Sequence, residues 1–77
     1  MKNKWVQLDI AKLESQILEL DMTELDVARE ARISARTWHR ITGENGYRTT
    51  FQNCCAIAYV LGISPDVLSP DIAKRKD

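Results

Sequence analysis

The side chains with the clearest chemical potential are three that lie close together in the chain, Arg36, His39 and Arg40. Their spacing places all three on one face if the segment is helical. Guanidinium groups bind phosphates and carboxylates through paired hydrogen bonds. The chemistry expected of this segment is therefore recognition of a charged partner.

Catalytic and metal chemistry are not expected. His39 is the only histidine, and no second base, nucleophile or carboxylate pair is placed around it. Gly43 and Gly46 are too few and too poorly placed for a phosphate-binding loop. Cys54 and Cys55 are adjacent, and neighbouring side chains on a helix point about 100° apart, so we expect two small hydrophobic residues rather than a disulfide. We predict no enzyme activity, no catalytic residue, no metal and no cofactor.

The size and composition indicate one globular domain. The chain has 77 residues, of which 44% are hydrophobic and 29% are charged. No apolar run approaches the roughly 18 residues of a membrane span, so no membrane partner is expected. The first residues also lack the apolar core of a signal peptide, which favours a cytoplasmic location.

The charges cancel overall but are unevenly distributed. Lysine plus arginine and aspartate plus glutamate number 11 each. One segment, residues 9–28, is acidic and contains a single basic residue, Lys12. The next segment, residues 29–48, carries five arginines against two glutamates: Arg29, Arg32, Arg36, Arg40 and Arg48 against Glu30 and Glu44. A local basic surface attracts phosphate even when the net charge is zero, although the acidic segment weakens that attraction.

Capping residues and apolar spacing predict five helices and no strand. Asp9, Thr23, Ser34 and Thr50 are the expected N-caps of helices at about 9–19, 24–31, 35–41 and 51–61. Ser64-Pro65 opens a fifth, short helix. Gly43 and Gly62 are expected to end the third and fourth helices. The fold class is therefore all-α, with an N-terminal extension at 1–8, a helical domain at 9–69 and a basic C-terminal tail at 70–77.

Two of these helices have predicted inward faces. In the helix at 35–41, Trp38 and Ile41 should point inward, which turns the cationic residues outward. In the helix at 51–61, the expected buried stripe consists of Phe51, Cys54, Cys55, Ala58 and Leu61.

The ordered series of apolar and turn residues resembles the lambda-repressor/Cro-like helix-turn-helix family of phage and bacterial transcriptional regulators. The matching elements, spread over residues 10–68, are Leu25-x-x-Ala28, Ile33-Ser34, Trp38-x-x-Ile41, Gly43, Phe51, Ile57-Ala58, Leu61-Gly62-Ile63-Ser64 and Val67-Leu68. The resemblance implies a compact five-helix DNA-binding domain whose helix-turn-helix is formed by the second and third helices.

The resemblance also implies a site. The third helix would lie in the major groove of a double-stranded DNA operator, bound as a homodimer, in a switch such as that between phage lysogeny and growth. The residues in base-reading positions are Ala35, Arg36, His39 and Arg40. The residues in phosphate-contacting positions are Arg29, Arg32, Thr37, Tyr47, Arg48, Thr49 and Thr50.

The chain departs from the family pattern at three positions. Arg32 stands where a turn glycine is common, so we expect a left-handed or strained backbone there at a cost of about 1 kcal/mol or more. Thr42 stands where a glutamate is common. Glu24 occupies a phosphate-facing position and should repel DNA.

An alternative function belongs to another class. The same fold can act as a modulator or antirepressor that binds another repressor protein, and the zero net charge and Glu24 favour this reading. Some residue roles also stay open: Tyr47 either reaches a phosphate or packs on the domain, and Trp5 and Leu68 lie either in the core or in a dimer contact.

Overall fold

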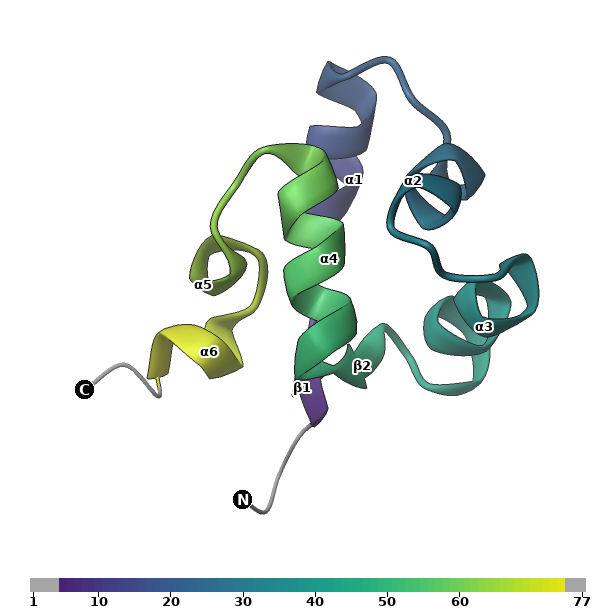
Figure 1. Cartoon of the computed structure of the whole chain (residues 1–77). Helices are drawn as coiled ribbons and strands as arrows, with labels where there is room; N and C mark the ends of the chain where they lie inside the picture. Colours follow the sequence, from purple (N-terminus) through teal and green to yellow (C-terminus); the bar gives the residue numbers. More distant parts are fainter. Residues whose placement is uncertain (1–4, 75–77) are drawn as a thin grey trace.

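The computed structural model describes residues 5–74 and shows a mostly helical chain with one small sheet (Figure 1). The elements in chain order are β1 (Trp5–Gln7), α1 (Ile10–Glu19), α2 (Glu24–Glu30), α3 (Ala35–His39), the π-helical turn η1 (Arg40–Glu44), β2 (Arg48–Thr50), α4 (Phe51–Leu61), α5 (Pro65–Leu68) and α6 (Pro70–Lys74). No helix within residues 5–74 is long and apolar enough to cross a membrane.

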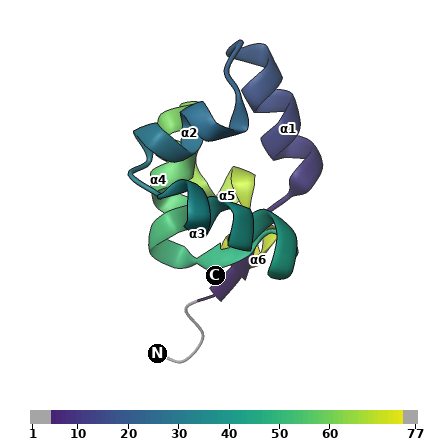
Figure 2. The ribbon, with the colours of Figure 1, turned by 90° about the vertical axis from the view of Figure 1, so that its right-hand side faces the viewer.

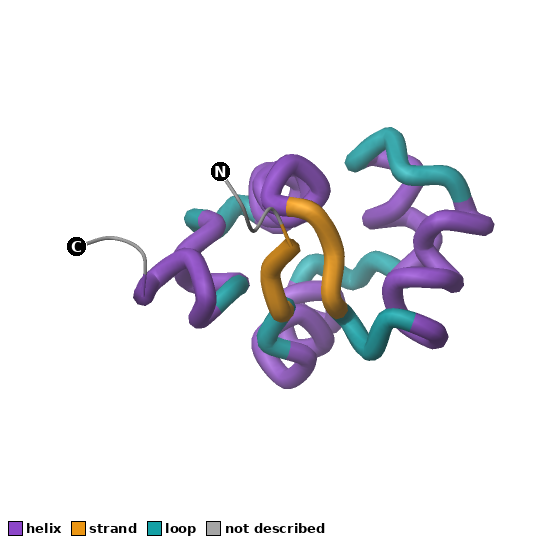
Figure 3. Tube along the Cα trace, turned by 90° about the horizontal axis from the view of Figure 1, so that it is seen from below, coloured by secondary structure: helices purple, strands orange, loops and turns teal. Residues whose placement is uncertain are grey.

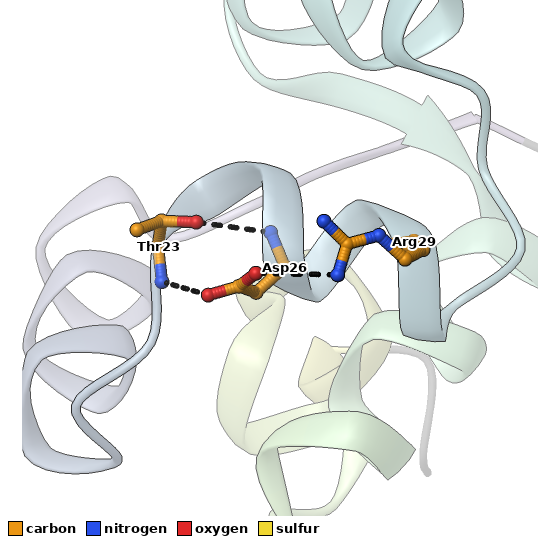
Figure 4. A network of polar contacts seen from close by, with 3 residues as sticks. All are labelled: Thr23, Asp26 and Arg29. Carbon is orange, nitrogen blue, oxygen red and sulfur yellow. Dashed lines mark hydrogen bonds and ion pairs between the residues drawn. The ribbon is translucent and has the colours of Figure 1, made fainter.

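The predicted N-caps are confirmed. The side chains of Asp9, Ser34 and Thr50 each accept a hydrogen bond from the backbone N–H three residues later. Thr23 forms a reciprocal pair with Asp26: each side chain accepts a hydrogen bond from the other residue's backbone N–H, at 3.1 and 3.0 Å (Figure 4). These bonds satisfy N–H groups that have no partner inside a helix, which fixes where the helices begin.

Three helices end in the same way, with one left-handed residue after the last turn. Asp21, Arg32 and Gly62 have φ of 57°, 62° and 74°. In each case the next residue donates its N–H to a carbonyl five positions back, which defines a Schellman motif. The left-handed backbone predicted at Arg32 is confirmed, whereas Asp21 was not anticipated.

The core forms where the helices meet the sheet. Its buried hydrophobic residues are Val6, Leu8, Leu13, Ile17, Val27, Ala28, Ile33, Trp38, Ile41, Cys54, Ile57, Ala58, Leu61, Leu68 and Ile72. Trp38 and Ile41 point inward as predicted, and Leu68 lies in the core. The stripe predicted on α4 is partly wrong, because Phe51 is 43% exposed and Cys55 is only half-buried.

The prediction of an all-α chain without strands is wrong. Strands β1 and β2 pair antiparallel, with Val6 opposite Thr49. Each strand has three residues, too short for an alternating pattern to identify, and the partners are far apart in sequence. Val6 and Leu8 are completely or almost completely buried, so residues 5–8 belong to the domain and not to an extension.

The boundary predicted at residue 70 is also wrong. Residues 70–74 form a sixth helix, α6, whose Ile72 packs in the core. The backbone N–H of Gln7 donates to the Asp71 carboxylate at 2.9 Å, and the Ser69 hydroxyl donates to the Gln7 carbonyl at 2.7 Å. These bonds cover the free edge of β1, which would otherwise present unpaired backbone groups. The remaining tail, residues 75–77, lies outside the described residues.

The elements surround the two-stranded sheet on four sides. Seen from below, α4 and α1 lie on opposite sides of the strands, α5 and α6 lie at one end, and α2 and α3 lie at the other (Figure 3). The pair α2–α3 therefore forms one edge of the molecule, and α3 is open to solvent there (Figures 1 and 2).

Candidate nucleic-acid interface

The site is built on the tight connection between α2 and α3. Arg32 donates its N–H to the Arg29 carbonyl at 3.1 Å, and Ile33 donates to the Ala28 carbonyl at 2.8 Å. Ile33 is buried and anchors the turn, and Ser34 then caps α3. Only residues 31–34 separate α2 from α3, so the position of α3 is set by α2.

A buried tryptophan fixes the rotation of α3 about its axis. Trp38 is 1% exposed, and its indole N–H donates to the Glu24 carboxylate on α2 at 3.0 Å. Glu24 therefore has an internal partner, which links the start of α2 to the middle of α3. A buried indole N–H needs an acceptor, and Glu24 provides one, so this carboxylate has a structural role in addition to the repulsion of DNA expected from its position.

The opposite face of α3 is open. Ala35, Arg36, His39 and Arg40 are all exposed, and the last three line a shallow hollow of about 370 Å³ together with Glu44. The structure thus brings together all four residues predicted to read bases. Within residues 5–74 no ion pair engages Arg36.

Glu44 joins this face, although it was not among the predicted site residues. Its carboxylate lies 3.9 Å from the Arg40 Nε, and both side chains are mostly exposed. An exposed ion pair at this distance is weak, so the Arg40 guanidinium can exchange the Glu44 carboxylate for another anion. The sequence feature that indicates this pairing is the four-residue spacing of Glu44 from Arg40, which brings two side chains together on a helix.

The helix widens into a π turn after His39, and Glu44 is the last residue of that turn. The N–H of Asn45 donates to the Arg40 carbonyl five residues back, and the Thr42 hydroxyl donates to the Trp38 carbonyl at 3.1 Å. Such a side-chain bond competes with the regular backbone pattern. The prediction that Gly43 ends the helix is wrong: Gly43 lies inside the π turn without a positive φ.

Three predicted phosphate-contacting arginines are exposed, namely Arg29, Arg32 and Arg48. Arg29 lies 3.4 Å from the Asp26 carboxylate, with its side chain 74% exposed (Figure 4). Hydrogen bonds from the Thr23 backbone and hydroxyl, and more weakly the Arg29 charge, lower the pKa of Asp26. The carboxylate therefore stays ionised and keeps α2 capped.

Two residues in predicted phosphate-contacting positions pack against or inside the core. Thr49 is 1% exposed, and its hydroxyl accepts a hydrogen bond from the Asn53 amide at 3.0 Å, because β2 turns that side chain into the core. Tyr47 packs against the core, and burial, followed by the Glu24 and Glu14 charges, raises its pKa.

The hydroxyls of Thr37 and Thr50 already have structural partners. Thr37 accepts a hydrogen bond from the Ser34 hydroxyl at 3.0 Å, and Thr50 caps α4. Both residues are half-buried, so any contact with a phosphate would be secondary to these roles.

A second hollow, of about 290 Å³, lies between α2 and the start of α3. It is lined by Leu25, Ala28, Arg29, Ile33, Ser34 and Ala35. Its mixed apolar and cationic lining extends the open surface of α3 toward Arg29.

The described residues offer no metal site, since no group of three or more histidine, cysteine, aspartate or glutamate side chains within residues 5–74 is arranged to hold an ion. Burial, and to a lesser extent Cys55, raises the pKa of the Cys54 thiol to about 12. Cys54 therefore stays protonated and unreactive at neutral pH.

Comparison with known proteins identified no relative of this chain. No protein-family model matches the chain, and searches of curated proteins and of solved structures also gave no match. The functional argument therefore depends on the geometry of α2, α3 and their surroundings.

Proposed function

We propose that the protein is a sequence-specific DNA-binding regulator of transcription, of the phage repressor or Cro type, that places α3 in the major groove. The observation that supports this best is the open face of Ala35, Arg36, His39 and Arg40 on a helix held by the inward Trp38. A helix that projects short and cationic side chains from a molecular edge fits the width of that groove.

Each residue has a distinct role in the proposal. Arg36 and Arg40 donate paired hydrogen bonds to guanine O6 and N7, and Ala35 contacts a thymine methyl group. His39 lies between base and backbone. Arg29, Arg32 and Arg48 neutralise phosphates and set the position of the domain on the duplex.

The zero net charge is compatible with this proposal. The Glu24 carboxylate accepts a hydrogen bond from Trp38, and the charges of Asp26 and Glu44 are paired with Arg29 and Arg40. Phosphates respond to the local field of the arginines more than to the total charge of a chain.

The experiment that tests base reading uses arginine-to-alanine variants and a duplex selected from a random pool. Arg40→Ala should weaken binding to the selected duplex by about 1–3 kcal/mol and relax the preference at one base position. Lys74→Ala removes a cation from the opposite end of the molecule. It should leave the affinity for the selected duplex and the base preference unchanged. Equal weakening of all sequences by Arg40→Ala would contradict base reading by Arg40.

A second candidate function is binding to another regulatory protein. It is favoured by the zero net charge and by Glu44, which gives the hollow on α3 a carboxylate beside the two arginines. A mixed face of this kind complements a protein surface as well as a nucleic acid. A folded protein that binds no duplex at low salt would make this candidate the leading one.

A further inference from the structure

Arg36 and Arg40 share one open face but differ in their surroundings. Both are exposed and line the hollow on α3. Within residues 5–74 the Arg40 guanidinium has the Glu44 carboxylate beside it, whereas no ion pair engages Arg36. A surface that only attracted phosphate would gain nothing from this carboxylate, because it lowers the local positive potential. Its presence indicates that Arg40 is directed to a different kind of acceptor.

The contact between Arg40 and Glu44 leaves the guanidinium able to bind. Arg40 is the first residue of η1 and Glu44 is the last, so a single turn of backbone holds the pair. The distance from the Arg40 Nε to the Glu44 Oε1 is 3.9 Å, which is longer than a hydrogen bond. The carboxylate thus attracts the guanidinium without taking one of its five N–H donors. Two of those donors suffice for the O6 and N7 of a guanine.

The Glu44 carboxylate acts differently on the two kinds of acceptor that a DNA duplex offers to Arg40. A phosphate carries a full negative charge, so the carboxylate repels it and competes with it for the guanidinium. The edge of a guanine carries no net charge and is repelled much less. Of the contacts open to Arg40, the contact with a base therefore loses least from the presence of Glu44.

We propose that Glu44 determines specificity: its carboxylate directs Arg40 away from phosphates and toward the guanine of a G·C base pair. This inference rests on the proposed function, in which α3 reads DNA, and it names the preferred acceptor of Arg40. Glu44 acts through Arg40 and is a positioning residue. Arg36 has no such neighbour, so its base preference does not depend on Glu44.

The test measures base preference at the position read by Arg40. That position is the one that Arg40→Ala relaxes in a duplex selected by the wild-type protein from a random pool, and the position read by Arg36 is identified in the same way with Arg36→Ala. Affinities are then measured at one salt concentration for the selected duplex, for its single-base variants at both positions, and for random-sequence duplex.

Glu44→Gln removes the charge and keeps the size of the side chain. It should raise the affinity for random-sequence duplex, because Arg40 becomes available to phosphates. It should also lower the preference for guanine at the Arg40 position about two- to fivefold, the range expected for an exposed ion pair. The preference at the Arg36 position should stay unchanged. The Glu44 side chain is 77% exposed, so the far-ultraviolet circular dichroism of the variant should match that of the wild type.

Glu19→Gln is the matched control, because it removes the same charge from an exposed residue at the end of α1 that lies away from α3 (Figures 1 and 2). It should leave the base preference at both positions unchanged. If Glu44→Gln changes the affinity for all duplexes equally, or if the base selected at the Arg40 position is not guanine, the role of Glu44 is overturned while DNA binding by α3 stands. If the folded wild-type protein selects no duplex, the proposed function fails, and the role of Glu44 fails with it.

Discussion

At the scale of single residues, the turn between α2 and α3 depends on a backbone conformation that its side chain disfavours. Arg32 has a φ of 62°, and both backbone N–H groups that close the turn lie at Arg32 and Ile33. A residue with a Cβ atom pays a conformational penalty in this region that glycine does not. An arginine retained at this position despite the penalty is consistent with the proposed contact between its charge and a DNA phosphate.

Arg32→Gly should therefore stabilise the domain by about 0.5–1 kcal/mol while weakening non-specific DNA binding. Urea denaturation measures the first effect. Arg29→Gly is the control, because it removes the same charge from a right-handed helical position and should destabilise by about 1 kcal/mol. Equal destabilisation by both variants would contradict the account of the turn.

The contact between Glu24 and Trp38 is a second residue-scale feature with a measurable effect. Glu24→Ala leaves the indole N–H of a side chain that is 1% exposed without its acceptor. We expect a loss of about 1–3 kcal/mol in the free energy of unfolding, measured by urea denaturation. Glu24→Gln keeps an acceptor oxygen and should restore most of that loss; a glutamine variant as unstable as the alanine variant would show that the hydrogen bond is not the cause.

At the scale of elements, the sequence predicted the helices well because their signals are local. Each cap residue bonds to a backbone N–H three positions away, so Asp9, Thr23, Ser34 and Thr50 identified four helix starts. The arginines of α3 were placed on an open face because Trp38 and Ile41 mark the inward side.

The missed elements depend on contacts between distant segments. Strand β1 is stabilised by β2 and by Ser69 and Asp71, which lie more than 60 residues later in the chain. The burial of Thr49 follows from this pairing, so a phosphate contact was assigned to a core residue. The π turn depends on the Thr42 back-bond, which spacing alone does not reveal.

Leu8 tests whether the first segment belongs to the domain. It is 1% exposed directly after β1, and its N–H donates to the Tyr47 carbonyl at 2.8 Å. Leu8→Ala should cost about 2–5 kcal/mol of stability, measured by thermal or urea unfolding. Leu18→Ala removes the same atoms from a side chain that is 80% exposed and should change little; comparable effects would mean that residues 5–8 are not part of the core.

At the scale of the whole molecule, two open surfaces lie on different sides of one small core. Exposed arginines lie at the α3 edge, whereas α4 contains no charged residue. The sequence contained both patterns, but only the fold shows which side of α4 is buried in the core and which side, with Tyr59, is exposed.

The most direct test of the central claim is the affinity for random-sequence duplex DNA at about 50 and 200 mM salt. Each neutralised phosphate contributes about −0.9 to the slope of log affinity against log salt concentration. We predict measurable binding at the lower salt with a slope of several units, reduced in an Arg29→Ala/Arg32→Ala/Arg48→Ala triple variant that remains folded. Absence of binding at the lower salt by the folded wild-type protein, or a slope that the triple variant leaves unchanged, would contradict the claim that the α3 edge binds DNA.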